Sequence, residues 1–178
     1  MNSPLPPTFE TSRCTLHRHR REDAEEMFYA YASKPEVTRF LIWPTHSSIE
    51  ETRQYLRYAI AQWDADQSIA WTVRLKPYGR LIGSIGLVKS EAEWQVGYVF
   101  SPTSWGKGLA SEVLIGLLGL IKGHLNEPIV SYVHQENPAS SRVLEKAGFI
   151  RTADPSEQFV FPNLNGGAHP GLKFRLNG

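Results

Sequence analysis

A glycine-containing loop runs directly into an apolar helical segment between Ser101 and Glu112, where the chain reads Ser-Pro-Thr-Ser-Trp-Gly-Lys-Gly-Leu-Ala-Ser-Glu. The strand before it ends at Pro102, because proline cannot donate to a ladder. The first N–H groups of a helix have no intrahelical partner and lie at the positive end of its dipole. Small residues such as Gly106 and Gly108 let an anion approach this backbone closely. The pattern indicates a diphosphate-binding turn, although a bend that needs glycines only for its shape has the same sequence.

Two other phosphate-binding motifs can be tested on this loop, and neither fits. A P-loop requires Gly-x-x-x-x-Gly-Lys-Ser/Thr, but Gly108 follows Lys107, and Ser101 stands where the first glycine belongs. A dinucleotide fingerprint requires Gly-x-Gly-x-x-Gly, and Ser111 takes the place of its third glycine. The acidic residue of that fingerprint follows the second strand, whereas Glu127, at about the right spacing, precedes its strand.

A second segment, residues 137–149, reads Asn-Pro-Ala-Ser-Ser-Arg-Val-Leu-Glu-Lys-Ala-Gly-Phe. Asn137 is a good N-cap, Pro138 suits the first helical position, and Gly148 can end the helix. Taken alone, these features predict a short helix and no chemistry.

Together the two segments resemble the GNAT superfamily of N-acetyltransferases, more narrowly its branch similar to ribosomal-protein N-terminal acetyltransferases. That branch has Trp-Gly-Lys-Gly-x-Ala-x-Glu at the first helix and Asn-x-Ala-Ser-x-Arg-Val-Leu-Glu-Lys-x-Gly-Phe at the second. Both occur here in that order, at residues 105–112 and 137–149. Weaker likeness at Thr11-Ser12-Arg13, Glu22-Asp23-Ala24 and Val96-Gly97-Tyr98 extends the resemblance over most of residues 10–150. It implies an N-acetyltransferase that moves an acetyl group from acetyl-CoA, as co-substrate, to a primary amine by direct attack.

The resemblance also implies which residues hold acetyl-CoA. The family's pyrophosphate loop, Gln/Arg-x-x-Gly-x-Gly/Ala, corresponds to Trp105, Gly106, Lys107, Gly108, Leu109 and Ala110, and Ser111 follows it. Trp105 departs from the family's first position, but the backbone donors of the loop remain. The strand residues Tyr98, Val99 and Phe100 should offer backbone groups to the pantetheine arm, which lies beside them like an added strand. Asn137 should contact the cofactor while it caps its helix.

Attack on a thioester sets three chemical requirements. The amine must first lose its proton, because an ammonium has no lone pair. The tetrahedral intermediate needs a donor for its oxyanion, for which the resemblance implies a backbone N–H near Val99 or Phe100. The leaving thiolate needs a proton or a hydrogen bond, and similar enzymes place a serine for this role at the position of Ser140. An ordinary polar residue in a first helical turn is the alternative interpretation of Ser140.

The sequence leaves the base open. Many relatives carry a glutamate where this chain has Gln95, which cannot act as a base. Glu93, two residues earlier on the same strand face, is a candidate base, directly or through a water, and a solvated turn residue is its alternative. His134 is another candidate, although a lone histidine at a strand end is usually structural. Because of Gln95, a catalytically weak CoA-binding sensor or regulatory domain is the alternative to an enzyme.

The acceptor site should form from the first two helices, their connection and the C-terminal hairpin. Tyr31, Phe40 and Trp43 could line it, and each could equally belong to the core. A protein N-terminus, an antibiotic and a polyamine all stay open as the amine acceptor, and the protein could be a monomer or a homodimer.

Hydrophobic periodicity places these residues on a single mixed sheet. We expect strands at 13–18, 70–75, 81–89, 94–100 and 129–133, another from Phe149, and a final hairpin ending at 172–176. We expect helices at 24–31, 48–63, 107–125 and 138–147, the second opened by a capping box of Ser48 and Glu51. Short links within 70–100 require antiparallel pairing. The fold class is α/β (α+β): a single mixed, mostly antiparallel sheet flanked by helices, GNAT-like, in one domain over 1–178 with 1–10 as a loose lead-in.

Composition argues against several classes of protein. Nineteen Lys+Arg against eighteen Asp+Glu give a net charge of +1, which argues against a general nucleic-acid binder. Cys14 is the only cysteine, so no intrachain disulfide can form, which fits a reducing cytoplasm. The N-terminus lacks the apolar core of a signal peptide, and the longest apolar run, 113–121, is too short to span a membrane. The histidines show no metal-ligand spacing, so we expect a cytoplasmic protein without a metal.

Overall fold

The computed structural model describes residues 5–152, 158–165 and 167–176, and the other residues lie outside the description. The strands are β1 (Thr8–Glu10), β2 (Cys14–Arg18), β3 (Ser68–Leu75), β4 (Arg80–Lys89), β5 (Trp94–Phe100), β6 (Ile129–His134), β7 (Phe149–Arg151), β8 (Gln158–Val160) and β9 (Ala168–Leu176). The helices and helical turns are η1 (Arg21–Asp23), α1 (Ala24–Met27), η2 (Phe28–Ala32), α2 (Pro35–Thr38), α3 (Ile49–Asp64), η3 (Pro102–Ser104), α4 (Leu109–Ile121) and α5 (Pro138–Lys146).

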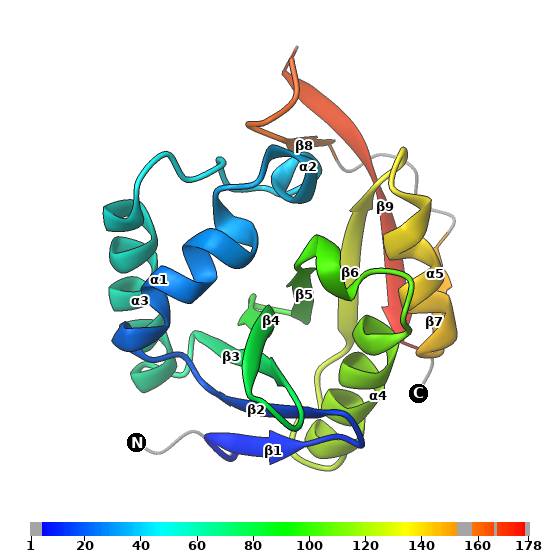
Figure 1. The fold of residues 1–178 in the computed structure, drawn as a ribbon. Helices are drawn as coiled ribbons and strands as arrows, with labels where there is room; N and C mark the ends of the chain where they lie inside the picture. The colour runs from blue at the N-terminus through cyan, green and yellow to red at the C-terminus, as the bar shows by residue number, and fades with distance from the viewer. Residues whose placement is uncertain (1–4, 153–157, 166, 177–178) are drawn as a thin grey trace.

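The described strands form a sheet in the order β1-β2-β3-β4-β5-β6-β9-β7, with β8 paired to β9. β5 and β6 are parallel, and the other pairs are antiparallel. Figure 1 shows α1, α2 and α3 on one side of the sheet and α4 and α5 on the other. The arrangement confirms the predicted fold class: a mixed, mostly antiparallel sheet flanked by helices.

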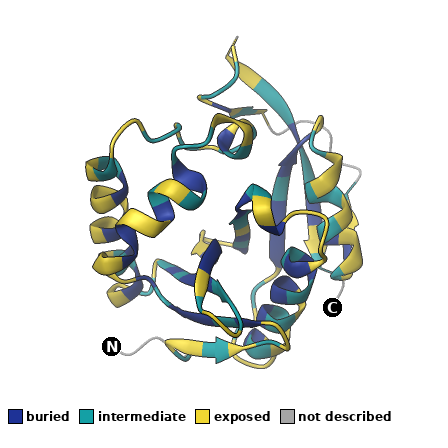
Figure 2. Ribbon diagram, in the orientation of Figure 1, coloured by how far each residue is buried: buried dark blue, intermediate teal, exposed yellow. Residues whose placement is uncertain are grey.

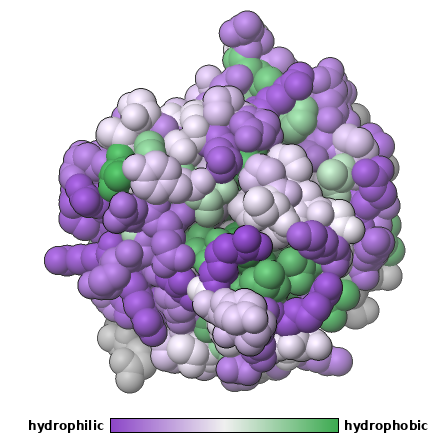
Figure 3. All heavy atoms as spheres, viewed as in Figure 1, coloured by the Kyte–Doolittle hydropathy of each residue, from purple (hydrophilic) through white to green (hydrophobic). Residues whose placement is uncertain are grey.

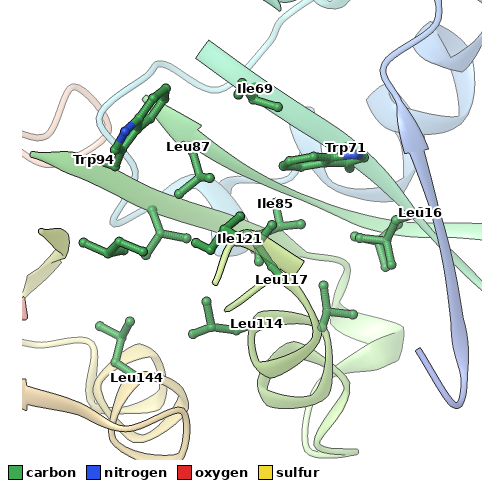
Figure 4. Packing of buried hydrophobic residues seen from close by; sticks show 14 of the residues in the cluster. Leu16, Ile69, Trp71, Ile85, Leu87, Trp94, Leu114, Leu117, Ile121 and Leu144 are labelled. Atoms are coloured by element: carbon green, nitrogen blue, oxygen red, sulfur yellow. The ribbon is translucent and has the colours of Figure 1, made fainter. Parts of the chain in front are cut away.

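The largest core lies between the sheet and α4. Residues of β3 and β4 face this helix with a period of two and are almost fully buried, among them Ile69, Trp71, Ile85 and Leu87. The helix supplies Leu114, Leu117 and Ile121 at helical spacing. Figure 4 shows these side chains between α4 and the strands, and Figure 2 shows the buried residues on the inner sides of the elements.

The predicted helix 107–125 is shorter in the structure, because α4 runs only from Leu109 to Ile121. Gly106 and Gly108 have φ angles of +72° and +73°, which no residue in a right-handed helix adopts, so the helix cannot begin before them. Its end comes where Gly123 has a φ of +82°. Within the described ranges, no helix is long and apolar enough to cross a membrane.

The predicted helix 24–31 is helical throughout but consists of two pieces, α1 and η2. The 3-10 turn η1 leads into α1, which gives way to the π-helical turn η2. Ser33 explains the widening, since both its N–H and its hydroxyl donate to the carbonyl of Phe28, five residues earlier, at 3.1 and 2.7 Å. Pro35 then starts α2 at the first helical position.

The capping box expected of Ser48 and Glu51 is wrong for the serine side chain, which does not bond the helix start. Ser48 is the N-cap of α3 but its side chain caps nothing. Glu51 instead accepts from the N–H and the hydroxyl of Ser47, at 2.7 and 2.8 Å. The glutamate reaches back one residue further than a capping box does, so the entry to the helix is fixed from outside it.

The expectation of a loose lead-in over residues 1–10 is also wrong where the structure describes it. Thr8–Glu10 form β1 and pair with β2, and Leu5 is buried in the main core. Residues 1–4 lie outside the described residues. The alternating pattern of this stretch is only three residues long, too short for periodicity to reveal.

Two neighbouring residues of α4 provide a test of the core. Leu114 is 0% exposed and Ile115 is 50% exposed. Leu114→Ala should lower the free energy of unfolding by about 2–5 kcal/mol because it leaves a cavity, whereas Ile115→Ala should change it by less than about 1 kcal/mol. Urea unfolding followed by circular dichroism measures both, and equal effects would contradict this orientation of α4.

Candidate active site

The loop between β5 and α4 presents an open helix start. Gly106, Lys107 and Gly108 are exposed, and a Cβ added to Gly106 would meet nothing within 4 Å. The first N–H of α4 with an intrahelical partner is that of Glu112, which donates to the carbonyl of Gly108 at 3.0 Å. Gly108 is the N-cap and has no side chain to cap with. The N–H groups of the first three helical residues therefore lack a helix or cap partner, as an anion site requires.

At the buried residues of this turn, a ligand can reach only backbone groups. The side chains of Leu109 and Ser111 are buried in the core or beside it, while Ala110 is half-buried. Trp105 is half exposed, and its indole N–H donates to the carbonyl of Phe100 at 2.8 Å. The ammonium of Lys107 donates to the carbonyl of Thr103 at 2.6 Å, which keeps a positive charge on the loop.

The start of α4 is braced against the turn between β1 and β2. The carboxylate of Glu112 accepts from the hydroxyl of Thr11 (2.7 Å), the N–H of Arg13 (2.8 Å) and the guanidinium of Arg13 (2.6 Å). The same guanidinium donates to the carbonyl of Lys107 at 3.0 Å. Burial alone would raise the pKa of Glu112, but these hydrogen bonds outweigh it and hold the pKa below its usual value. The brace connects two parts of the sequence pattern that lie about 100 residues apart.

β5 and β6 pair at only two positions, Trp94 with Ile129 and Gln95 with Val130. On its other edge β5 stays paired with β4 as far as Phe100. Beyond Gln95, no strand in the described part of the chain pairs with β5 on the β6 side. The sheet forks at this point, and backbone groups of β5 face the gap.

Side chains occupy the two ends of this free edge. The hydroxyl of Ser131 donates to the carbonyl of Val96 at 2.9 Å, and the indole of Trp105 donates to that of Phe100. Alternation along the strand directs the N–H and C=O of Tyr98 and the N–H of Phe100 to the same edge. By the same rule the N–H of Val99 points to β4, where Val99 is the register partner of Ser84. Tyr98 therefore marks the stretch of edge left for an added partner.

Ser140 lies in the first turn of α5, across the gap from Tyr98. Asn137 caps this helix and accepts from the N–H of Ser140 at 3.2 Å, as the sequence predicts for a cap. The hydroxyl of Tyr98 donates to the carbonyl of Ser140 at 3.0 Å and lies 2.8 Å from its hydroxyl oxygen. Burial raises the pKa of Tyr98 well above its usual value, so its phenol stays protonated. The two hydroxyls form a hydrogen-bonded pair at the mouth of the fork.

The structure does not bring Glu93 to Ser140. Glu93 lies five residues before Tyr98, about 16 Å along an extended strand, at the closed end of the fork. Its carboxylate accepts from the hydroxyl of Tyr132 at 3.0 Å and from the ammonium of Lys173 at 3.1 Å. Glu93 therefore forms a structural ion pair with Lys173, on the face of the sheet away from α4.

Of the aromatic residues expected around the acceptor, Phe40 reaches the open end of β6. Its ring stacks on His134 with centroids 4.8 Å apart. Tyr31 is buried in the smaller core under α1 and α3, and Trp43 packs against that core. Figure 3 shows a hydrophobic patch near the middle of the face in view, between β4 and α4, surrounded by hydrophilic residues.

Sequence reasoning missed the roles of the Ser131 hydroxyl and of the Tyr98 phenol. The first partner lies 35 residues from Ser131 and the second 42 residues from Tyr98, so no local spacing signals either contact. Among the described residues, no group of three or more His, Cys, Asp or Glu side chains could hold a metal.

The brace at Glu112 provides a test of how the helix start is held. Glu112→Gln should lower the free energy of unfolding at pH 7 by about 1–3 kcal/mol, because it removes a charged acceptor. The pKa of Glu112 is depressed in the folded protein, so its contribution is present above a pH of about 4.5 and is lost as the pH falls further. The difference from the wild type should shrink accordingly in urea titrations at pH 7 and pH 3. Glu50→Gln, in exposed ion pairs with Arg53 and Arg57, is the control and should lower the free energy of unfolding much less than Glu112→Gln does.

Comparison with known proteins places this site in a family. Residues 13–150 match the model of the acetyltransferase (GNAT) domain. The chain is 31% identical over 167 residues to the uncharacterized N-acetyltransferase YoaA of Bacillus subtilis (strain 168), covering 88% of this chain and 90% of that protein.

Solved structures show the same fold. The ribosomal L7/L12 alpha-N-protein acetyltransferase RimL, in complex with coenzyme A, is 18% identical with a TM-score of 0.81 over 96% of both chains. The microcin C7 self-immunity acetyltransferase MccE, in complex with acetyl-CoA and AMP, is 15% identical with a TM-score of 0.83 over 97% of both chains. Together with the family match, the forked sheet and the open helix start show that this chain belongs to the GNAT acetyltransferase family and is an acetyltransferase.

Proposed function

We propose that the protein transfers an acetyl group from acetyl-CoA to an amine by direct attack. The observation that carries the proposal is the continuity of two unpaired stretches of backbone: the free edge of β5 at Tyr98 and the uncapped start of α4. One loop of eight residues, 101–108, joins them. A ligand with amide groups at one end and a diphosphate at the other matches both.

The residues present fit coenzyme A. The N–H and C=O of Tyr98 can pair with a pantetheine amide as an added strand would. The N–H groups of Leu109, Ala110 and Ser111 can donate to diphosphate oxygens, with the ammonium of Lys107 nearby. The structures of RimL and MccE hold coenzyme A and acetyl-CoA, which supports this ligand for a chain of the same fold. Bound here, acetyl-CoA would supply the thioester.

The chain's own groups would then serve the transfer. The N–H of Phe100 faces the gap and can donate to the oxyanion, whereas that of Val99 faces β4. Ser140 would donate its hydroxyl proton to the leaving sulfur, and the phenol of Tyr98 would then donate to the serine hydroxyl oxygen in place of the serine carbonyl. We propose no part for Glu93 in proton removal, because its carboxylate is paired with Lys173 and Tyr132. The sensor alternative predicts binding of acetyl-CoA without thiol release over a panel of amines.

Gly108→Asp should abolish binding of acetyl-CoA. A Cβ at this position would lie 3.7 Å from the guanidinium of Arg13, and the carboxylate beyond it would bring bulk and negative charge to the loop that we propose binds the diphosphate. Isothermal titration with acetyl-CoA measures the loss. Gly108→Asn tolerates the same left-handed backbone without the charge and should keep part of the affinity, and Gly119→Asp, exposed on the same helix, should keep all of it. Wild-type affinity in Gly108→Asp would show that the loop does not bind the phosphates.

Ser140→Ala should lower kcat by about 10²-fold or more while leaving affinity for acetyl-CoA nearly intact, because it removes the donor to the leaving thiolate. Thiol release in the presence of an amine measures kcat, and titration measures affinity. Ser141→Ala, one residue along the same helix, is the matched control and should turn over like the wild type. Unchanged turnover in Ser140→Ala would reject the acid role of Ser140.

A further inference from the structure

The guanidinium of Arg13 holds one peptide unit of the loop between β5 and α4. Its Nη1 donates to the carbonyl of Lys107 at 3.0 Å. Because a trans peptide directs its C=O and N–H in opposite directions, the N–H of Gly108, in the same peptide unit, points away from Arg13. Gly108 is exposed, and its N–H donates to no group in the described part of the chain. The arginine therefore turns a free backbone donor outward.

Arg13 is itself held in place by several hydrogen bonds. Its Nε donates to the carboxylate of Glu112 at 2.6 Å, and its backbone N–H donates to the same carboxylate at 2.8 Å. The hydroxyl of Thr11 donates to Glu112 at 2.7 Å and accepts from the N–H of Cys14 at 3.1 Å. The carbonyl of Arg13 accepts from the N–H of Lys76 at 2.9 Å. The turn between β1 and β2 thus presents the guanidinium from a fixed backbone.

This turn lies directly on α4. A Cβ added to Gly116 would come within 2.7 Å of Cγ2 of Thr11 and 3.8 Å of the ring of Phe9, so only a glycine allows this approach. Gly116 lies four residues after Glu112, on the same face of the helix. Figure 1 shows the turn beside α4. The close contact and the carboxylate together fix where Arg13 stands relative to the helix start.

The loop needs such support because its own backbone resists rotation only weakly. Gly106 and Gly108 have φ angles of +72° and +73°, and Lys107 between them has a negative φ. Glycine adopts both signs of φ with little difference in energy, so the peptide units beside it can turn over. Once turned, the unit that joins Lys107 to Gly108 would point its carbonyl at an anion in place of its N–H. The ammonium of Lys107 does not prevent this, since it donates to the carbonyl of Thr103.

The contribution of Arg13 is geometric, because the charge of its guanidinium is balanced. Glu112 lies 2.6 Å away, so the pair adds no net charge to the loop. The guanidinium also approaches the loop from its carbonyl side, which is the side opposite the free N–H of Gly108. An anion bound by that N–H would therefore meet the peptide unit and not the arginine.

We infer that Arg13 is a positioning residue for the cofactor: by holding the carbonyl of Lys107, it presents the N–H of Gly108 to the diphosphate of coenzyme A. Glu112 and the turn after β1 hold Arg13 for this task. The inference rests on the proposed function and extends the cofactor site to residues that do not touch the ligand. It makes the affinity for coenzyme A depend on a contact made about 100 residues before the loop.

The test measures the Kd for coenzyme A by isothermal titration in two variants that separate geometry from charge. Arg13→Lys keeps the positive charge, but one ammonium cannot span Glu112 and the carbonyl of Lys107 as the guanidinium fork does. Its Kd should rise about 10- to 100-fold, as for the loss of a hydrogen bond to a charged group. In Glu112→Gln an NH2 group replaces the oxygen that accepts from Arg13, so the guanidinium is released and Kd should rise as well. Removal of a negative charge would by itself lower that Kd.

The backbone amide signal of Gly108 in isotope-edited NMR spectra reports the orientation of the peptide unit. In the wild type, coenzyme A should move the proton signal of Gly108 downfield, because the N–H gains a charged acceptor. In unliganded Arg13→Lys this signal should broaden, since the peptide unit samples two orientations, while the signal of Val113 in the buried part of α4 stays sharp. Broadening of both signals would show a general loosening of the helix and overturn the inference. Arg53→Lys, exposed on α3, is the control and should match the wild type in Kd and in both signals.

An unchanged Kd in Arg13→Lys, or a lower Kd in Glu112→Gln, would overturn the inference and leave the proposed function standing, because the wild type would still bind coenzyme A. If Arg13→Lys does not fold, Thr11→Val is measured in the same way. It keeps the shape of the side chain and removes one donor to Glu112, so its Kd should rise by a smaller factor, and a wild-type value would again overturn the inference. Failure of the wild type to bind coenzyme A would contradict the proposed function itself.

Discussion

The N–H and C=O groups along each edge of β5 need hydrogen-bond partners. On the edge that faces β6, a strand supplies them only in part, and side chains supply others. β6 pairs with the first two residues of β5 on one edge, and with β9 from Val130 to His134 on the other. At the fork, the Ser131 hydroxyl takes over from a backbone donor. At the far end, the Trp105 indole does the same for Phe100. Between these two side chains, the N–H and C=O of Tyr98 are left to pair with an extended ligand that carries amide groups.

In the proposed function, the free edge of β5 requires an anion site at a fixed distance from it. The loop after β5 achieves this because Gly106 and Gly108 allow a left-handed backbone on either side of Lys107. The helix behind it is held twice, by the apolar stripe of α4 in the core and by Glu112 at the turn after β1. The edge strand β1 is therefore part of the site's support, although it touches none of the ligand-facing groups.

The sequence predicted the elements whose signals are local. Alternation marked β3, β4 and β5, the glycines marked the start of α4, and Asn137 with Pro138 marked α5. Family resemblance added the cofactor residues, which no periodicity could supply. Long-range contacts could not be predicted from local patterns. Tyr98 and Ser140 are 42 residues apart in the sequence, and Asn163 and Trp43 are 120 apart. The placement of β9 between β6 and β7 has the same origin, because strand order depends on packing and not on local pattern.

The fork also divides the residues around it between the two faces of the sheet. Ser140 and the start of α4 lie on one side of the sheet, and His134, stacked on Phe40, lies on the other. The rings around His134 come from the loop after α2 and from the hairpin of β8 and β9. Changes in these two segments can therefore leave the geometry of the β5 edge and of the α4 start unaltered. Asn163 limits this freedom, since it ties both segments together and any exchange of one must keep its hydrogen bonds to the other.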